Sequence, residues 1–176
     1  MTTATDTRGE IVNKVKQSDK LVTIDLQQFY DTTPRAGLDL KQFLFKGLIL
    51  KEKEFRHALK EYDWSQYEGQ YVCIYCSTDA ILSKWAYMLV GQHVTPFAKE
   101  VFKGRPDDIL HELYRRRLAD TDWNKYRDKF VILKGCSGDE RPVPDSVYLY
   151  ATQKLIPHVK KLMYGEACSN VPVYRG

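Results

Sequence analysis

The chain has 176 residues, of which 43% are hydrophobic and 28% are charged. This is the composition of a soluble globular protein, and the length supports one sizeable core but is marginal for two. The formal net charge of +4 is small, and the one dense basic run, Arg115–Arg117, points in three directions around a helix. Nucleic acid is therefore not an expected partner, because phosphate-binding proteins concentrate Lys and Arg on one face.

The sequence contains no stretch close to the ~20 apolar residues that a membrane-spanning helix needs, and its polar N-terminus does not resemble a signal peptide. We therefore expect a cytoplasmic protein without membrane contact, and we count a homodimer among its candidate states. Residues 1–10 lack an apolar pattern and are expected to be disordered, with one domain over residues 11–176.

The first third of the chain gives mixed signals. Alternating apolar residues predict a strand at 21–26, and the composition of residues 31–37 predicts a turn. The dense apolar segment 38–50 is either a buried helix or a strand followed by a turn at Gly47, and periodicity does not separate the two.

The middle of the chain has clearer elements. Apolar residues at helical spacing predict an amphipathic helix over residues 51–62, and the continuous run Tyr71–Tyr75 suits a central strand that is covered on both faces. Residues 77–79 offer N-caps for a following helix, which Gly91 ends or loosens. A second helical segment is expected from Pro96 to Gly104.

The second half of the chain repeats this order of elements. Asp107 and Asp108 are expected to cap a helix, and residues 130–133 form the next apolar strand. A helix is expected from about Asp145 to Tyr164, followed by a closing strand at residues 171–174.

An internal duplication accounts for this order. An Asp-Trp turn, a buried strand and a Cys-Ser pair occur twice, about sixty residues apart, and Tyr, Pro, Lys and Gly then recur at one constant offset. We place the copies at about residues 47–104 and 105–165. The predicted fold is α/β: a single domain with a small mixed sheet, two pseudo-symmetric helix–strand–helix repeats and an N-terminal strand at an edge.

The cysteines are the candidate functional residues. Cys73 lies within a strand and is expected in the core, because free Cys is readily buried. Cys76, Cys136 and Cys168 are each followed by serine. Crossover connections make successive strands parallel, so Cys76 and Cys136 should meet at one sheet edge if the two repeated strands are neighbours. Cys168 can join them only if the chain turns back near Pro157.

Three thiolates brought together would repel one another unless a cation held them, so this cluster predicts zinc or an iron–sulfur cluster. Asp79 is a candidate fourth ligand, beside Glu166, His57 or a water molecule. The alternatives are functional thiols without a metal, or cysteines that only pack.

The chain also resembles a known family. Residues 48–53, 63–67, 85–88, 134–136 and 163–174 are similar to the bacterial domain of unknown function family 2480, and the likeness covers nearly everything from Ile11 onward. The resemblance implies a link to iron–sulfur cluster assembly, and it names iron–sulfur assembly proteins as candidate partners.

The leading hypothesis is therefore a metal-binding or iron–sulfur-binding protein with an accessory role in cluster assembly. A competing hypothesis is a thiol-dependent enzyme with Cys136 as nucleophile, since a helix N-terminus lowers the pKa of a thiol. A third is a protein-interaction module with structural cysteines, for which the twelve tyrosines supply aromatic surface.

Overall fold

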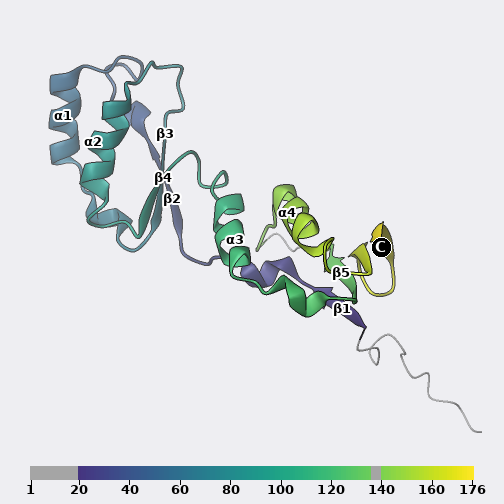
Figure 1. Cartoon of the computed structure of the whole chain (residues 1–176). Coiled ribbons are helices and arrows are strands. Elements are labelled where there is room, and N and C mark those ends of the chain that lie inside the picture. Colours follow the sequence, from purple (N-terminus) through teal and green to yellow (C-terminus); the bar gives the residue numbers. More distant parts are fainter. Residues whose placement is uncertain (1–19, 136–139) are drawn as a thin grey trace, which may run out of the picture. The chain divides into compact units, whose positions relative to one another are not determined.

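The computed structural model describes residues 20–135 and 140–176, and Figure 1 shows the order of its elements. The chain divides into two compact units. We name Phe29–Ala119 the central unit, and Met1–Gln28 together with Asp120–Gly176 the split unit. The described residues form an α/β fold with two small sheets, so the predicted fold class is confirmed, although one sheet was expected. The predicted disorder of residues 1–10 lies outside the described residues. The prediction of one domain stays a prediction, because two compact units can belong to one domain.

The sheet of the central unit is wholly parallel. Its order is β2 (Arg35–Asp39), β3 (Tyr71–Tyr75) and β4 (Glu100–Lys103). Helix α1 (Glu52–Glu61) connects β2 to β3, and α2 (Lys84–Val94) connects β3 to β4. Figure 1 shows the two helices side by side. They share one core with the sheet, which includes Phe55, Leu59, Val72, Ile74, Ala86 and Val90.

The other face of β3 carries Tyr71 and Cys73, which pack with Ile109 and with Leu113 of α3 (Leu110–Ala119). Both faces of β3 are therefore covered. This explains why the strand reads as a continuous apolar run, since alternation appears only when one face meets water. The predicted central strand and the predicted burial of Cys73 are both confirmed.

The split unit has a four-stranded mixed sheet. Its order is β1 (Leu21–Ile24), β5 (Phe130–Lys134), β6 (Lys161–Gly165) and β7 (Asn170–Arg175). The first three strands are parallel and β7 is antiparallel to β6. Helix α4 (Asp145–Leu155) connects β5 to β6, and three of its residues are buried: Val147, Ala151 and Leu155. The N-terminal strand lies at an edge, as the sequence predicts.

Short 3₁₀ helices follow aspartates at four turns, at Leu26–Phe29, Leu40–Phe43, Ser65–Tyr67 and Trp123–Tyr126. Each aspartate accepts a hydrogen bond of 3.0 Å from the backbone amide two residues later. This side-chain bond fixes the turn, because an Asp carboxylate satisfies amides that the short helix leaves free. The Asp-Trp pair that occurs twice in the sequence forms two of these turns, at Asp63 and Asp122, and the tryptophan of each pair is buried.

Two strands lie in segments that were predicted to be helical. Residues 96–104 and 145–164 were predicted to be helical, but α2 ends at Val94 and α4 ends at Leu155, and β4 and β6 follow. A turn containing proline ends the helical region in each case, since proline cannot continue the helix. The following strands are short and begin with a charged residue, which hides them from a search for apolar runs.

Three local predictions were also wrong. Residues 35–37 belong to β2 rather than to a turn. Gly91 lies inside α2 instead of ending it. Residues 77–79 do not cap α2, which begins at Lys84 after Ser83, and Ser83 makes no side-chain capping bond. Within the described residues no helix has the length and apolar character that spanning a membrane would require.

Candidate binding cleft between β2 and β3

The loop after β3 is bound to the loop after β2. Ser77 donates its backbone amide to Oδ1 of Asp39 (3.0 Å), and the Thr78 hydroxyl donates to the carbonyl of Gly47 (3.0 Å). Burial opposes ionisation of Asp39, but hydrogen bonds from Ser77 and Lys41 outweigh it and hold its pKa below the usual value. The two loops are therefore held together at the carboxyl end of the parallel sheet, where open α/β sheets bind ligands.

Cys76 follows β3 directly and is half-buried, with its Sγ 3.3 Å from Oγ1 of Thr78. Cys73 is fully buried, and burial raises the pKa of its thiol to about 11. A thiol of this kind stays protonated at neutral pH and is a poor ligand or nucleophile, which agrees with a packing role.

Cys168 is exposed and lies just past β6. Because β6 runs parallel to β5, the chain does turn back after α4: the amide of Gly135 donates to the carbonyl of Gly165 (3.3 Å). Cys168 therefore follows the sheet edge at which β5 ends. Cys136 lies outside the described residues, and the prediction of a nucleophilic thiol lies outside them with it.

The strands that precede the predicted thiols do not share a sheet. Strand β3, which precedes Cys76, belongs to the central unit, and β5 and β6 belong to the split unit. The expectation that the two repeated strands are neighbours is therefore wrong. In the part of the chain that the structure describes, no three His, Cys, Asp or Glu side chains gather as metal ligands would. Zinc or iron–sulfur binding by Cys76, Cys136, Cys168 and Asp79 stays a prediction.

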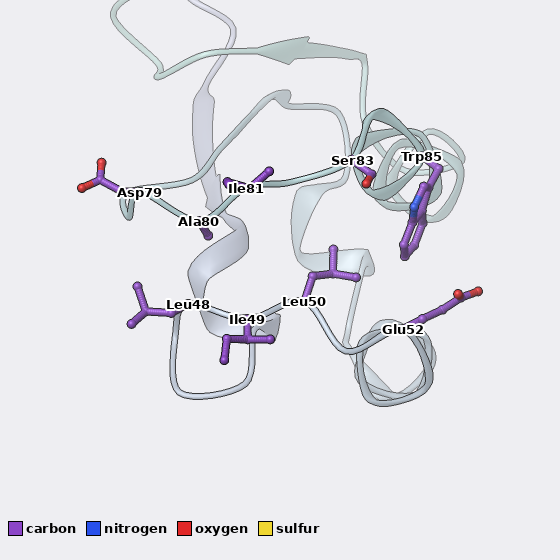
Figure 2. Close-up of a pocket in the computed structure, with 9 residues that line it drawn as sticks. All are labelled: Leu48, Ile49, Leu50, Glu52, Asp79, Ala80, Ile81, Ser83 and Trp85. Carbon is purple, nitrogen blue, oxygen red and sulfur yellow. The ribbon is translucent and has the colours of Figure 1, made fainter.

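A cleft of about 610 Å³ opens between the two loops. Figure 2 shows residues 48–50 on one segment facing Asp79 to Ser83 on the other, with Leu50 directed toward the facing segment. Asp79 lies at one end, and Glu52 and Trp85, from the starts of α1 and α2, lie at the other. We name this hollow the β2–β3 cleft; its lining is Leu48, Ile49, Leu50, Glu52, Asp79, Ala80, Ile81, Ser83 and Trp85.

The lining contains exposed aliphatic side chains. Ile81 is 98% exposed, Leu48 57% and Ile49 55%. Single exposed aliphatic residues are common on protein surfaces, but several around one hollow form a patch that typically marks an interaction site. At the other end of the cleft the Trp85 ring meets Phe55 edge-on (6.1 Å between centroids), which anchors that wall to the core.

The segment that carries Ile81 also has unused backbone groups. Asp79, Ala80, Ile81 and Leu82 make no backbone hydrogen bond with any residue that the structure describes. Ser83, which ends the segment, is extended (φ −67°, ψ 149°). Residues 79–82 lie outside helices and strands, and a segment whose amides and carbonyls are free can pair with an extended chain.

The sequence did not reveal this cleft. Leu48 and Ile49 belong to the dense apolar segment for which the sequence left open a buried helix or a strand followed by a turn, and only exposure distinguishes them from core residues. A weak signal was present at Ala80-Ile81-Leu82, a short apolar run between polar residues that shows no strand or helix periodicity.

A comparison with protein families places the chain. The family model described as "Protein of unknown function (DUF2480)" matches residues 9–176, almost the whole length. Searches of curated proteins and of solved structures find no match. The chain is therefore a member of the DUF2480 family, as its sequence resemblance predicts.

Proposed function

We propose that this protein is an interaction module whose β2–β3 cleft binds an extended, apolar segment of a partner polypeptide. The observation that carries the proposal is the exposed aliphatic lining of a cleft at the carboxyl end of a parallel sheet. Burying Ile81 and Leu48 against a partner would remove apolar surface from water, which is worth ~25 cal/mol per Å².

The free backbone groups of residues 79–82 support a polypeptide as the occupant. An added strand can pair with these groups while its alternate side chains enter the apolar cleft, so the backbone supplies affinity and the cleft supplies specificity. A ligand without a regular row of amides and carbonyls would leave them unpaired.

The acidic ends of the cleft indicate where a basic residue of the partner would lie. Glu52 is already paired with Arg56 (2.9 Å), whereas Asp79 is exposed and makes no ion pair with any described residue. A Lys or Arg at the Asp79 end of the bound segment would complement this charge, with an effect on selectivity and association rate larger than on affinity.

The test is selection of random peptides by phage display on the immobilised full-length protein. We expect enrichment of peptides with alternating apolar residues and one basic residue. Ile81→Asp should weaken the selected peptides at least about tenfold, which is the loss of one central apolar anchor. Met88→Asp is the matched control, because Met88 is 73% exposed on α2 and does not line the cleft.

One further variant and one modified peptide separate the contributions of charge and of backbone pairing. Asp79→Lys should remove the preference for a basic residue, and methylation of alternate amides in a selected peptide should weaken its binding if the backbones pair. Peptides that bind Ile81→Asp as tightly as wild type would refute the proposal.

We also propose that the two units are copies of one ancestral element. This retains the duplication inferred from the sequence but changes its bounds, because α3 was placed in the second copy, at about residues 105–165, and belongs to the central unit. Matching backbone bonds support it. In the central unit the carbonyl of the residue before β3 accepts a hydrogen bond from the backbone amide of the lysine before β4 (2.8 Å). In the split unit the carbonyl of the residue before β5 accepts the same bond from the lysine before β6 (3.0 Å). Gly104 directly follows β4 and Gly165 ends β6, with φ of 134° and 127°. The sequences Asp-Leu-Gln-Gln-Phe and Asp-Leu-Lys-Gln-Phe, at residues 25–29 and 39–43, extend the match to β1 and β2.

A second candidate function is the metal or iron–sulfur site predicted from the cysteines. One observation favours it. Strand β6 is parallel to β5 and ends at the same edge of the sheet, and Cys168 follows the end of β6 after a short loop. Metal analysis of anaerobically purified protein, with a Cys76→Ser, Cys136→Ser and Cys168→Ser triple variant as control, tests this function. Less than about a tenth of an equivalent of zinc or iron would exclude a structural site.

A further inference from the structure

A second cleft, of about 370 Å³, lies wholly within the split unit. We name it the α4–β7 cleft. Helix α4 forms one wall through Leu149 and Thr152, and the strands supply Leu133, Met163 and Val173. Its size falls within the range of small-ligand sites, about 300–1,000 Å³.

The cleft owes one wall to an irregularity in the sheet. Leu162 pairs with Tyr174 and Met163 pairs with Pro172, so Val173 is an extra residue between two paired positions of β7. Such a bulge redirects the side chain of the extra residue, and bulges are frequent beside functional sites. Val173 is 53% exposed and lines the cleft.

Two tyrosines in the lining are held by the backbone at the end of β5. The hydroxyl of Tyr148 donates to the carbonyl of Lys134 (3.0 Å), and that of Tyr164 donates to the carbonyl of Gly135 (3.2 Å). Their rings meet edge-to-face at 5.5 Å. A Cβ at position 135 would lie 2.9 Å from the Tyr164 ring, so a glycine there admits the ring.

One charge faces the cleft. Among the described residues that line it, Asp145 is the only acidic or basic one, and it makes no ion pair with any residue that the structure describes. Aromatic faces and a carboxylate in one apolar cleft are the groups that recognise organic ammonium ions, through ring quadrupoles and direct charge attraction.

We propose that the α4–β7 cleft binds a small organic cation, an ammonium group carried on an apolar body. The body lies against Leu149, Met163 and Val173, and the ammonium lies between the tyrosine rings and the carboxylate of Asp145. This site is independent of the β2–β3 cleft, because the two clefts share no residue.

Phenethylamine, which is protonated at neutral pH, is the probe, and 3-phenylpropionate is its partner of opposite charge with the same ring. Titration of the full-length protein followed by amide nuclear magnetic resonance should give saturable shifts around Asp145, Tyr164 and Val173 with phenethylamine, at a dissociation constant of about 1 mM or below. The carboxylate probe should give none.

The variants test each wall. Asp145→Asn should weaken phenethylamine about fivefold, the change expected from one exposed ion pair. Leu149→Arg should abolish binding, because it places a cation in the apolar wall of the cleft. The fold should tolerate this change, because the Leu149 side chain is 65% exposed. Met88→Arg, at an exposed apolar position of α2 outside this cleft, should bind like wild type.

No saturable shift up to ~10 mM phenethylamine would overturn the proposal. Equal binding of 3-phenylpropionate would refute the role of Asp145, and unchanged binding by Leu149→Arg would place the ligand elsewhere.

Discussion

Replacing Asp31 by Asn should destabilise the central unit. Asp31 is 8% exposed and is the only buried charged residue in the described part of the chain. Its carboxylate accepts from the amide of Thr33 (2.9 Å), the hydroxyl of Tyr71 (3.0 Å) and the guanidinium of Arg117 (3.0 Å). These bonds connect the segment before β2 with β3 and α3, the face of the sheet opposite α1 and α2.

The magnitude follows from what asparagine can accept. Its carbonyl can still receive the Thr33 amide, but its amide cannot accept from Tyr71 or Arg117. Leaving the buried Tyr71 hydroxyl without its acceptor costs about 1–3 kcal/mol. The Arg117 side chain is 47% exposed, so solvent screening limits that pair to about 1 kcal/mol. The expected total is about 3 kcal/mol.

Urea unfolding of the full-length protein measures this loss. Trp64 and Trp85 belong to the central unit, so tryptophan fluorescence reports its unfolding once Trp123 of the split unit is replaced by Phe in every variant compared. With a urea dependence of about 1.5 kcal/mol per M, the midpoint should fall by about 2 M. Asp63→Asn is the matched control, because Asp63 is an exposed turn cap and asparagine caps equally well. A loss below about 1 kcal/mol, or an equal loss in the control, would refute the reasoning.

Three further predictions use the same assay or simple chemistry. Burial opposes ionisation of Asp31, but its hydrogen bonds outweigh this and hold its pKa far below the unfolded value of ~3.9. The stabilisation is therefore full above about pH 5 and declines as pH falls toward the folded-state pKa, so the difference in urea midpoint between wild type and Asp31→Asn should shrink steadily from about pH 5 to pH 2. Cys73, buried and with a pKa raised to about 11, should resist a thiol reagent at pH 8 until urea unfolds the protein, whereas exposed Cys168 reacts at once; fast labelling of Cys73 in the folded state would contradict its burial. Gly165→Ala should lower the free energy of unfolding by about 2 kcal/mol, because φ at this position is 127° and the new Cβ would lie 2.6 Å from the carbonyl oxygen of Ser169. Gly91→Ala should instead raise it by about 0.5–1 kcal/mol, because Gly91 lies inside α2 and no atom is near the position that the new Cβ would take.

Strong local patterns made part of the fold predictable. The helix α1 has apolar residues at helical spacing on an otherwise charged segment, and β3 is an apolar run buried on both faces. Both were identified from sequence. Strands β4 and β6 were not, because each is only four or five residues long and begins with a charged side chain. Their pairing with a central strand, rather than any local preference, makes them strands.

The candidate sites depended on information that the sequence does not carry. Cys73 could be assigned to the core from its place in a strand, and exposure of Cys168 follows from its loop. The β2–β3 cleft could not be foreseen, since Leu48 and Ile49 have the composition of core residues and only the tertiary fold leaves them in solvent. The α4–β7 cleft depends on the extra residue Val173 in β7, and a bulge has no reliable signature in one sequence.

The pairing of β1 with β5 has a consequence for the order of folding. Leu21 pairs with Phe130, so the whole central unit lies within the loop that this pairing closes. Every strand pair of the central unit joins residues much closer in sequence. Closing a long loop costs more chain entropy than closing a short one, and contacts between distant residues form slowly.

During synthesis the central unit has all its strands before β5 is made, whereas β1 has none of its partners. The central unit should therefore fold on the ribosome while β1 remains an unpaired edge. Refolding of the full-length protein should accordingly show protection of β3 amides from hydrogen exchange before protection of β5 amides. Until β5 appears, the exposed backbone of β1 is the part of the nascent chain most open to mispairing with another chain.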